Sequence, residues 1–536
     1  MPLARDRAHA RMCKSGIRGV CDTSQGIGAP GRVDHYEGGG DGKMIFQDMR
    51  EWMALLRDRG MLKEIAAEVD WNCEIGAILR AVCDRSGPAI LFSSIRDYAG
   101  GPCTKLFSSA LARRDRLALM LGLPTEVPNS DMLQHVMRKY DERIPPKLLN
   151  AGPVKENIIR GDEVNLFEFP VPKWHHLDGG RYINTFSSIV TRDPETGVQN
   201  VGLYRGMIGS RNTIPSLLIM GQHWGHHFAK YCAMGKPMPV AGVCGTEPIV
   251  PFIASSPIPA GVCEYDVMGA FRGAPMELVR CETCDLEVPA TAEIVFEGSI
   301  SADPTTFELE GPFAEYTGYI GNVPTRRHVI RVSCITHRND PIFRGTLAGT
   351  LPGSYSETAI MSAVQRAALA WNILKAQGVP GVLDVYIPPV TVGTSIAVKI
   401  RKTYQGQAKH VAAALWGSGA AMFRYKNVIV ADEDIDVTSY EALDWAFAYR
   451  VDPGGDDIQV FRGSFGSNLD PSSPIEDRDV AILGAGLWNR LLIDATKNWK
   501  LERRPEWGGD VYPPTVAPAP EHRDLVKRRW KEYGLD

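Results

Sequence analysis

The stretch SETAIMSAVQRAALAWNILKAQG, from Ser356 to Gly378, separates two parts of the chain that differ in character. It predicts one long helix, because a Ser-Glu pair is typical of a helix N-terminus and a glycine lets the chain leave the helix at its end. Strand-like segments dominate before this stretch, whereas strands alternate with helices after it. The stretch therefore predicts a helix that links two domains.

The region before this helix, about residues 156–350, carries β-rich segments punctuated by glycine and proline. The clearest of them are NTFSSIVTRD, VQNVGLYRGMIG, PMPVAGVCG, ATAEIVFEGSI and RRHVIRVSCITHR. This spacing predicts a barrel or a sandwich rather than a parallel sheet.

Two other regions alternate helices with strands. Near the start, MREWMALLRDRGML and CEIGAILRAVCDRSG predict helices and PAILFSSI predicts a buried strand. Beyond the long helix, VLDVYIPPV, SIAVKIRKTY and KNVIVADEDI predict strands, and QAKHVAAALWGSG and SYEALDWAFAYR predict helices. The expected fold class is a multidomain α/β (α+β) protein. Its expected parts are a disordered tail or start-site artefact (1–43), an N-terminal α/β domain (44–155), a β-rich domain (156–352), a linker helix (353–378), a C-terminal α/β domain (379–502), and a Pro-rich extension with a terminal helix (503–536).

Bulk composition excludes several classes of protein. A chain of 536 residues is too long for one core, so two to four domains are expected. A net charge of -4 gives no electrostatic reason to expect nucleic acid or an anionic membrane as a partner. The sequence contains no run of about 18 apolar residues, so it predicts no membrane span. The eleven cysteines are scattered, unlike those of a small secreted domain, so the cytoplasm is the expected compartment.

The stretch TTFELEGPFAEYTGYIG, from Thr305 to Gly321, places Glu308, Glu310 and Glu315 among glycine, proline and aromatic residues. Such acids either form a surface turn or have pKa values adjusted for proton transfer. The stretch alone leaves both interpretations open.

Histidines and scattered polar residues suggest a metal site. His223 and His227 are four residues apart and would share a face of a helix, as metal-binding pairs often do. Asn200, Arg205 and Glu264 stand among apolar neighbours, where unpaired charges are costly. Asn oxygen, imidazole and carboxylate together suit Mn²⁺ or Mg²⁺ better than structural zinc. Strand alternation puts Asn200 and Arg205 on opposite faces, so the strand must bulge or end between them if both serve one site.

Two other motifs are weak. GAGLWN, residues 484–489, lacks the third glycine of a dinucleotide fingerprint, and its glycines suit a loop. CETC, residues 281–284, is a single CxxC without a second pair, which is more typical of a structural pair of small residues than of zinc or redox chemistry.

From about residue 44 to 500, the chain resembles the UbiD-type decarboxylases, which depend on prenylated FMN. The resemblance rests on these stretches in this order: QNVGLYRGMI, GQHWGHH, SSPIPAGVCEYDVMGA, LEVPATAEIVFEGSI, ELEGPFAEYTGY, TYQGQAKHVAAALWGS, VIVADEDIDV, WAFAYRVDP and IDATKNW.

The resemblance implies a fold, cofactors and partners. It places a split β-barrel flavin-binding domain between the two α/β domains, of which the C-terminal one mediates assembly into a homodimer or homohexamer. The implied cofactors are prenylated FMN, Mn²⁺ or a similar divalent metal, and K⁺. The implied partners are a small carboxylic acid as substrate and a flavin prenyltransferase that supplies the cofactor, with no nucleic acid and no membrane.

The resemblance also assigns residues. The family's manganese ligands match Asn200, His223 and Glu264, and potassium-contacting positions match Ser255 and Arg450. Flavin-contacting positions match Leu203, Tyr204, Arg205, Gln222 and His223, and Lys409 matches a phosphate contact.

The family's catalytic trio matches Arg205, Glu310 and Glu315. Ubiquinone-pathway members carry Asp at the last position, so Glu315 favours the aromatic- and acrylic-acid branches. The implied activity is a carboxy-lyase that reversibly decarboxylates an aromatic, heteroaromatic or α,β-unsaturated acid through a covalent adduct with prenylated FMN. Glu315 is the implied proton donor, which requires burial to raise its pKa.

Two alternatives remain open. One is an ordinary-FMN flavoprotein of the reductase type on the same barrel, and the other is a non-catalytic flavin-binding assembly protein. Within the decarboxylases, His175 and His176 would suit a phenolic, heteroaromatic or aryl-acyl substrate equally well.

Overall fold

The computed structural model describes residues 46–321, 323–349 and 351–535. The expectation for residues 1–43 therefore lies outside the described residues. Within them the chain is a mixed α/β protein with several sheets, which confirms the predicted fold class. In this part of the chain no helix combines the length and apolar character needed to cross a bilayer.

The N-terminal region forms a small sheet of order β1-β2-β3-β18. β1 and β2 are parallel, β2 and β3 are antiparallel, and β18 joins parallel to β3 from far along the chain. The elements are α1 (Met49–Asp58), β1 (Leu62–Ile65), α2 (Glu74–Asp84), β2 (Ala89–Phe92), β3 (Lys105–Ser108), α3 (Arg114–Met120), α4 (Asn129–Asp141) and β18 (Ile342–Arg344).

The central region is built on a seven-stranded antiparallel sheet of order β5-β17-β12-β9-β6-β7, with β8 paired to β17. All five β-rich segments named from the sequence contribute strands to it. Its strands are β5 (Asn157–Arg160), β6 (Ser188–Arg192), β7 (Gln199–Leu203), β8 (Thr213–Pro215), β9 (Met238–Cys244), β12 (Ile294–Ile300) and β17 (Val329–His337).

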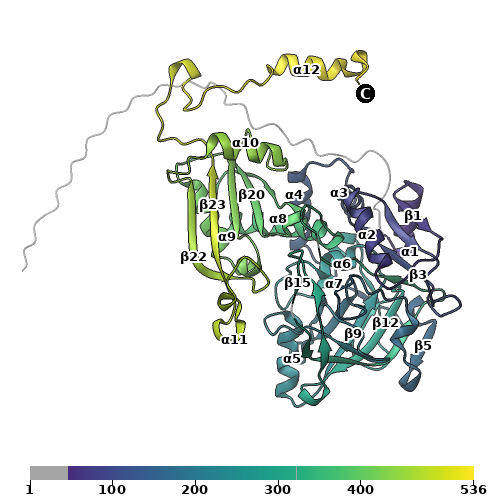
Figure 1. Ribbon diagram of the computed structural model, residues 1–536. Helices are drawn as coiled ribbons and strands as arrows, with labels where there is room; N and C mark the ends of the chain where they lie inside the picture. The colour runs from purple at the N-terminus through teal and green to yellow at the C-terminus, as the bar shows by residue number, and fades with distance from the viewer. Residues whose placement is uncertain (1–45, 322, 350, 536) are drawn as a thin grey trace, which may run out of the picture. The chain divides into compact units, whose positions relative to one another are not determined.

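Helices and hairpins surround this sheet. Helices α6 and α7 contact β7, and Figure 1 shows them between α8 and strands β9 and β12. The helices are α5 (His223–Ala233), α6 (Ile249–Ala254) and α7 (Glu264–Arg272). The smaller strands are β4 (Lys147–Leu148), β10 (Glu277–Arg280), β11 (Glu287–Pro289), β13 (Glu308–Glu310), β14 (Phe313–Ala314), β15 (Ile320–Gly321) and β16 (Thr325–Arg327).

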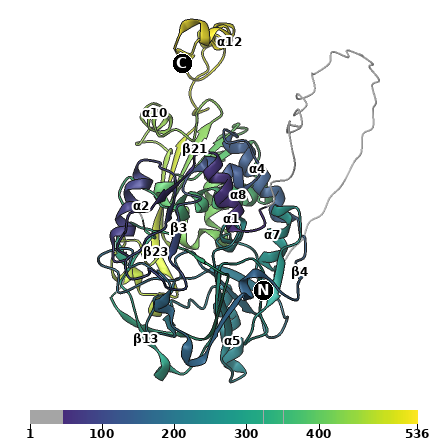
Figure 2. The same cartoon turned by 90° about the vertical axis from the view of Figure 1, so that its right-hand side faces the viewer.

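The linking helix α8 spans Glu357–Ala376, as its sequence predicts. The Ser356 hydroxyl accepts a hydrogen bond from Ala359 N at its start, and Gly378 follows its end with φ of 71°. Most of its side chains are buried, because it packs against α4 of the N-terminal region and against β19 and α9 of the C-terminal region. Figures 1 and 2 both show α8 beside α4.

The C-terminal region forms a five-stranded sheet of order β19-β20-β21-β23-β22. The three central strands are parallel, and β19 and β22 run antiparallel at the edges. Gly486 begins β23, so the loop expected for GAGLWN is wrong at that glycine. The elements are β19 (Val382–Tyr386), β20 (Ser395–Ile400), α9 (Gln407–Trp416), β21 (Asn427–Asp432), α10 (Tyr440–Arg450), β22 (Ile458–Gly466), α11 (Val480–Leu483), β23 (Gly486–Ala495) and the exposed α12 (Pro520–Arg529).

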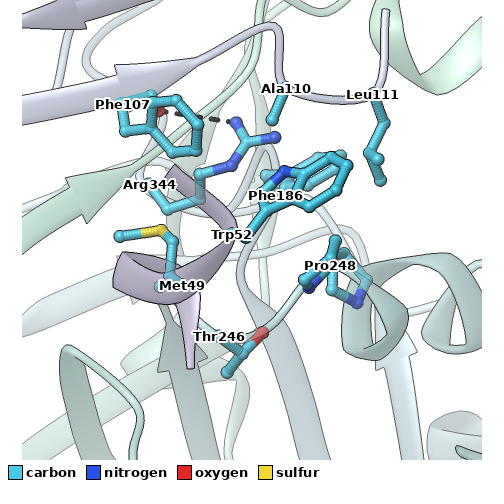
Figure 3. Close-up of a pocket in the computed structure, with 11 residues that line it drawn as sticks. Met49, Trp52, Phe107, Ala110, Leu111, Phe186, Thr246, Pro248 and Arg344 are labelled. Atoms are coloured by element: carbon cyan, nitrogen blue, oxygen red, sulfur yellow. Dashed lines mark hydrogen bonds between the residues drawn. The ribbon is translucent and has the colours of Figure 1, made fainter. Parts of the chain in front are cut away.

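A buried ion pair joins these regions. Arg344 at the end of β18 donates to Glu357 of α8 over 2.5 Å, and Leu111 N donates to the same carboxylate oxygen over 2.6 Å. Side-chain exposure is 6% for Arg344 and 1% for Glu357. The guanidinium also stacks 4.1 Å from the Phe186 ring centre, and Figure 3 shows it between Phe107 and Phe186.

We predict that Glu357→Gln lowers the free energy of unfolding by about 3–5 kcal/mol, because it leaves the buried Arg344 charge without its partner. Urea unfolding would measure the change. The control is Glu433→Gln, which breaks the exposed pair with Arg401 and should cost less than about 1 kcal/mol. Equal costs in the two variants would contradict the importance of burial.

Candidate functional site

Arg205 reaches the site because β7 ends before it. The strand stops at Leu203, so strand alternation no longer keeps Asn200 and Arg205 on opposite sides. The Tyr204 ring folds back over Gly202, where an added Cβ would approach the ring atoms to 2.5 Å. The end of the strand at Leu203 thus explains how Asn200 and Arg205 can lie near one site although strand alternation alone would separate them.

Two acids of the stretch 305–321 contact the Arg205 guanidinium. Arg205 Nε lies 3.0 Å from Glu310 Oε1, and Nη2 donates to Glu310 Oε2 over 3.1 Å. Nη1 donates to Glu315 Oε1. Glu310 is 1% exposed and Glu315 is 7% exposed, so both acids meet the arginine away from bulk water. Glu308 differs from them, since it is only partly buried and accepts from the Thr213 hydroxyl.

Burial has a direct effect on Glu315. It raises the pKa of this carboxyl above the usual value of a glutamate, while Arg205 acts in the opposite direction and the neighbouring Glu310 adds to the rise. A carboxyl with a raised pKa can keep a proton at a pH where most glutamates have lost it. The site can therefore combine a permanent cation with an acid able to donate a proton.

A second set of residues fixes the turn between the two acids. The Tyr182 hydroxyl lies 2.8 Å from Glu310 Oε1 and 3.1 Å from the Pro312 carbonyl oxygen. The Asp178 carboxylate accepts from Ala314 N over 3.1 Å. Gly179 N donates to Pro312 O over 2.8 Å, and an added Cβ at Gly179 would lie 1.9 Å from Gly311 O. The segment 178–182 thus sets the separation of the acids.

Asn200, His223 and Glu264 come together beside this arrangement. His223 Nδ1 lies 3.2 Å from Asn200 Oδ1 and 3.8 Å from Glu264 Oε1. Glu264 is 3% exposed and accepts from Val201 N over 2.8 Å. The side chains of Asn200 and His223 line a cavity of about 370 Å³. Their mixed oxygen and nitrogen donors suit a divalent ion such as Mn²⁺.

His227 is not part of this group. Its Nδ1 lies 3.0 Å from the Thr191 hydroxyl on β6, although it is on the same helix as His223. Gln222 precedes α5 and accepts from Trp224 Nε1, and the Trp224 ring stacks on Tyr204 at 4.2 Å. Tyr204 connects the two groups, because its hydroxyl accepts from Asn200 Nδ2 over 3.2 Å and Arg205 follows it in the chain. Leu203 precedes Tyr204 in the chain, and Gln222 and Tyr204 both contact Trp224.

One buried amide in this region lacks a partner. Asn184 is 4% exposed, yet neither its side-chain oxygen nor its nitrogen has a hydrogen-bond partner within the part of the chain that the structure describes. Its backbone N donates to Gly206 O, directly after Arg205. An unpaired buried amide is costly, so this position fits a bound ligand with polar ring atoms, such as a flavin.

The remaining predicted residues lie elsewhere. Lys409 on α9 is half-exposed and its Nζ lies 3.8 Å from an Asp456 oxygen. Ser255 follows α6, donates to the Pro251 carbonyl and accepts from Gln365. Arg450 on α10 pairs with Asp434 over 2.7 Å and lies 3.5 Å from an Asp432 oxygen. The structure does not bring Ser255 and Arg450 into contact with each other, nor Lys409 with Arg205.

Sequence reasoning missed Asp178 and Tyr182. Their stretch, WHHLDGGRYI, stood out only for its histidines, of which His175 contacts the Ala348 carbonyl through Nε2 over 2.8 Å. The available signal was a pair of glycines between an acid and a tyrosine, which indicates a close approach of two backbones.

Three family models match the chain. They are described as the N-terminal domain, the Rift-related domain and the C-terminal domain of 3-octaprenyl-4-hydroxybenzoate carboxy-lyase, and they match residues 53–139, 147–351 and 358–495.

Known proteins resemble the chain over most of its length. The pyrrole-2-carboxylic acid decarboxylase of Pseudomonas aeruginosa is 34% identical, over 91% of this chain and 98% of its own. The structure of Sedimentibacter hydroxybenzoicus vanillic acid decarboxylase in open form matches with a TM-score of 0.79 and 30% identity, over 92% of this chain and 100% of its own. An evolved dimeric form of the UbiD-class enzyme HmfF from Pelotomaculum thermopropionicum, in complex with prFMN, matches with a TM-score of 0.73 and 29% identity, over 86% and 97%.

We predict that Glu315→Gln makes stability less dependent on pH. The pKa of Glu315 is higher in the folded chain than in the unfolded chain, so wild-type stability is lost as pH rises from about 4 through the raised value. Glutamine does not titrate, so the variant should lose less stability over this range. Urea midpoints at several pH values would measure this, with Glu308→Gln as a matched loss of one acid. Parallel curves for wild type and Glu315→Gln would contradict the raised pKa.

Proposed function

Because the chain belongs to the UbiD family and is a carboxy-lyase, we propose that it reversibly decarboxylates an aromatic, heteroaromatic or α,β-unsaturated carboxylic acid with prenylated FMN as cofactor. The relatives that act on pyrrole-2-carboxylic acid and vanillic acid support a ring-bearing acid as substrate.

The observation that carries this proposal is the buried Arg205 between two acids of different character. Arg205 binds the substrate carboxylate, because a planar guanidinium matches a carboxylate with paired hydrogen bonds. Glu310 keeps Arg205 oriented through two contacts, and the Tyr182 hydroxyl holds Glu310 in turn. A protonated Glu315 no longer competes as an anion for Nη1 of Arg205, which leaves that nitrogen for the substrate.

Glu315 is the proton donor in this proposal. Loss of carbon dioxide leaves a carbon that must gain a proton, and the Glu315 Oε atoms are held beside the arginine that positions the substrate. Burial keeps water away and favours the protonated form. In the reverse direction the same carboxylate takes up the proton.

The described residues fit a flavin. The unpartnered Asn184 amide lies next to Gly206, and Tyr204, Arg205 and Gln222 would surround the ring system. When bound, prenylated FMN supplies the electron sink that the breaking carbon–carbon bond requires. Structures of the HmfF relative in complex with FMN and with prFMN support a flavin as the cofactor.

For the metals, we assign Mn²⁺ or a similar ion to Asn200, His223 and Glu264, where it would hold the cofactor phosphate. K⁺ is proposed for the end of α6, near Ser255. From the C-terminal domain, Arg450 would lie in the vicinity of the K⁺ site and Lys409 would bind the cofactor phosphate. We further propose that a flavin prenyltransferase supplies the cofactor and that the C-terminal domain forms a homodimer or homohexamer.

Glu315→Gln should lower turnover by at least about 100-fold, because it removes the proton donor without removing the side chain's volume. Product formation and deuterium exchange from solvent would be measured on protein with a known flavin content. The variant should retain its flavin, and Glu308→Gln should retain both flavin and activity. Turnover near the wild-type value would exclude Glu315 from the proton-transfer role.

Glu264→Ala should lose manganese and flavin together, because the metal is proposed to connect the protein to the cofactor phosphate. Glu264→Gln keeps an acceptor for Val201 N and tests the charge alone. Metal analysis and flavin absorbance would be compared with Asp266→Ala on the same helix, which should bind both. Retention of metal and flavin in both Glu264 variants would show that the site is misplaced.

A further inference from the structure

Cys281 and Cys284 lie against a buried acid from another strand. Cys281 directly follows β10, and Cys284 lies in the same loop before β11. The two thiol sulfurs and a carboxylate oxygen of Glu297, on β12, all lie within 4.8 Å of one another. The CxxC pair that appeared isolated in the sequence therefore has a third potential ligand.

Glu297 has no cationic partner among the residues that the structure describes. It is 1% exposed, and it takes part in no ion pair of the described chain. Its oxygens accept from Glu282 N, Thr283 N and the Thr283 hydroxyl over 2.7–2.8 Å. These neutral donors leave the net negative charge in place, and a buried charge normally needs a counter-ion or a metal.

Two basic side chains lie next to the cysteine loop but do not pair with Glu297. Lys155 and Arg160 both pair with Glu282, over 2.5 Å each, and Glu282 lies between the two cysteines in the loop. Two thiolates and one carboxylate around a divalent ion carry a net charge of about −1. The basic pair beside the loop is placed to reduce the cost of that charge.

We propose that Cys281, Cys284 and Glu297 bind a thiophilic divalent metal ion of the Zn²⁺ class, with solvent as the fourth ligand. Zn²⁺ binds sulfur at about 2.3 Å and carboxylate oxygen at about 2.0–2.2 Å, so tetrahedral ligands lie about 3.8 Å or less from one another. The donor atoms, all within 4.8 Å of one another, would have to move closer by at most about 1 Å to reach that spacing. The cysteines are partly exposed, which gives the ion and the solvent ligand a path to the site.

This site is chemically distinct from the Asn200 group, and it has a structural consequence for it. The loop that carries the cysteines leads into β11, whose Glu287 exchanges hydrogen bonds with the Gln199 side chain. The Tyr265 hydroxyl also reaches the Glu287 carbonyl. Gln199 and Tyr265 are the sequence neighbours of Asn200 and Glu264. A metal in the loop would thus hold the hairpin that supports both residues.

Cobalt binding provides a test whose charge-transfer absorbance depends on thiolate ligands. Full-length protein, reduced and freed of metal, would be titrated with Co²⁺, and the spectrum of the metal-free sample would be subtracted to remove flavin absorbance. One equivalent should produce a thiolate-to-cobalt charge-transfer band with the intense visible bands of tetrahedral coordination. A manganese-type site of nitrogen and oxygen donors gives no such band.

Matched variants locate the ligands. Cys281→Ser and Cys284→Ser should abolish the band, whereas Cys232→Ser, which changes a partly buried cysteine on α5, should retain it. Glu297→Gln should keep the thiolate band and weaken binding by at least about tenfold, as expected for the loss of a ligand. Zinc analysis of protein purified without chelator should show one equivalent fewer in both cysteine variants than in Cys232→Ser.

Three results would overturn the proposal. The first is folded, reduced wild-type protein that binds cobalt without a thiolate band. The second is a band that persists in both cysteine variants. The third is a Cys281–Cys284 disulfide, found by mass spectrometry in zinc-free protein isolated without reductant, which would assign the pair to redox chemistry. Circular dichroism and the melting temperature would confirm that each serine variant is folded.

Discussion

The buried contact of Arg344 with Glu357 is the constraint on which the arrangement of this protein depends. Glu357 begins the linking helix, and one of its oxygens accepts from Arg344 at the end of β18, in the N-terminal sheet, and from the backbone of Leu111. Neither charge can leave this position without losing its compensation in a nearly dry environment. The Arg344 guanidinium also stacks on Phe186, just before β6 of the central region. The start of α8 is therefore held by the N-terminal and central regions together, and the helix in turn contacts β19 and α9 of the C-terminal region.

Arg205 is a second, largely buried cation held by carboxylates. Two carboxylates surround it, and the second cation nearby, Arg327, lies 4.0 Å from Glu310. Burial raises the pKa of Glu315, the acid that Arg327 does not pair with. Tyr182 adds its hydrogen bond to Glu310, not to Glu315. The difference between two acids five residues apart thus arises from their neighbours rather than from their own chemistry.

The sequence predicted those parts of the fold whose signals are local. The Ser-Glu start and the closing glycine of 356–378 predicted α8, and the β-rich segments between glycine and proline residues located the central strands. It missed β22, whose central residues are exposed, and β23, which places Arg490 and Asp494 at buried positions where the alternation predicts apolar residues. Arg490 is tolerated there because backbone carbonyls, among them those of Ala421 and Phe465, accept from its guanidinium. The grouping of Arg205 with its acids was available only through family resemblance, since it depends on contacts more than 100 positions apart.

Those long-range contacts also explain why the acid segment cannot be understood from the central sheet alone. Tyr316, next to Glu315, shares a 2.7 Å hydrogen bond with the Ser467 hydroxyl directly after β22, and the Arg424 guanidinium lies 4.8 Å from its ring centre. Both partners belong to the C-terminal region, which α8 positions. The backbone that carries Glu315 is therefore held from two sides, by the Asp178–Tyr182 segment and by the C-terminal region. A shift between the two regions would therefore reach the backbone of Glu315 through Tyr316.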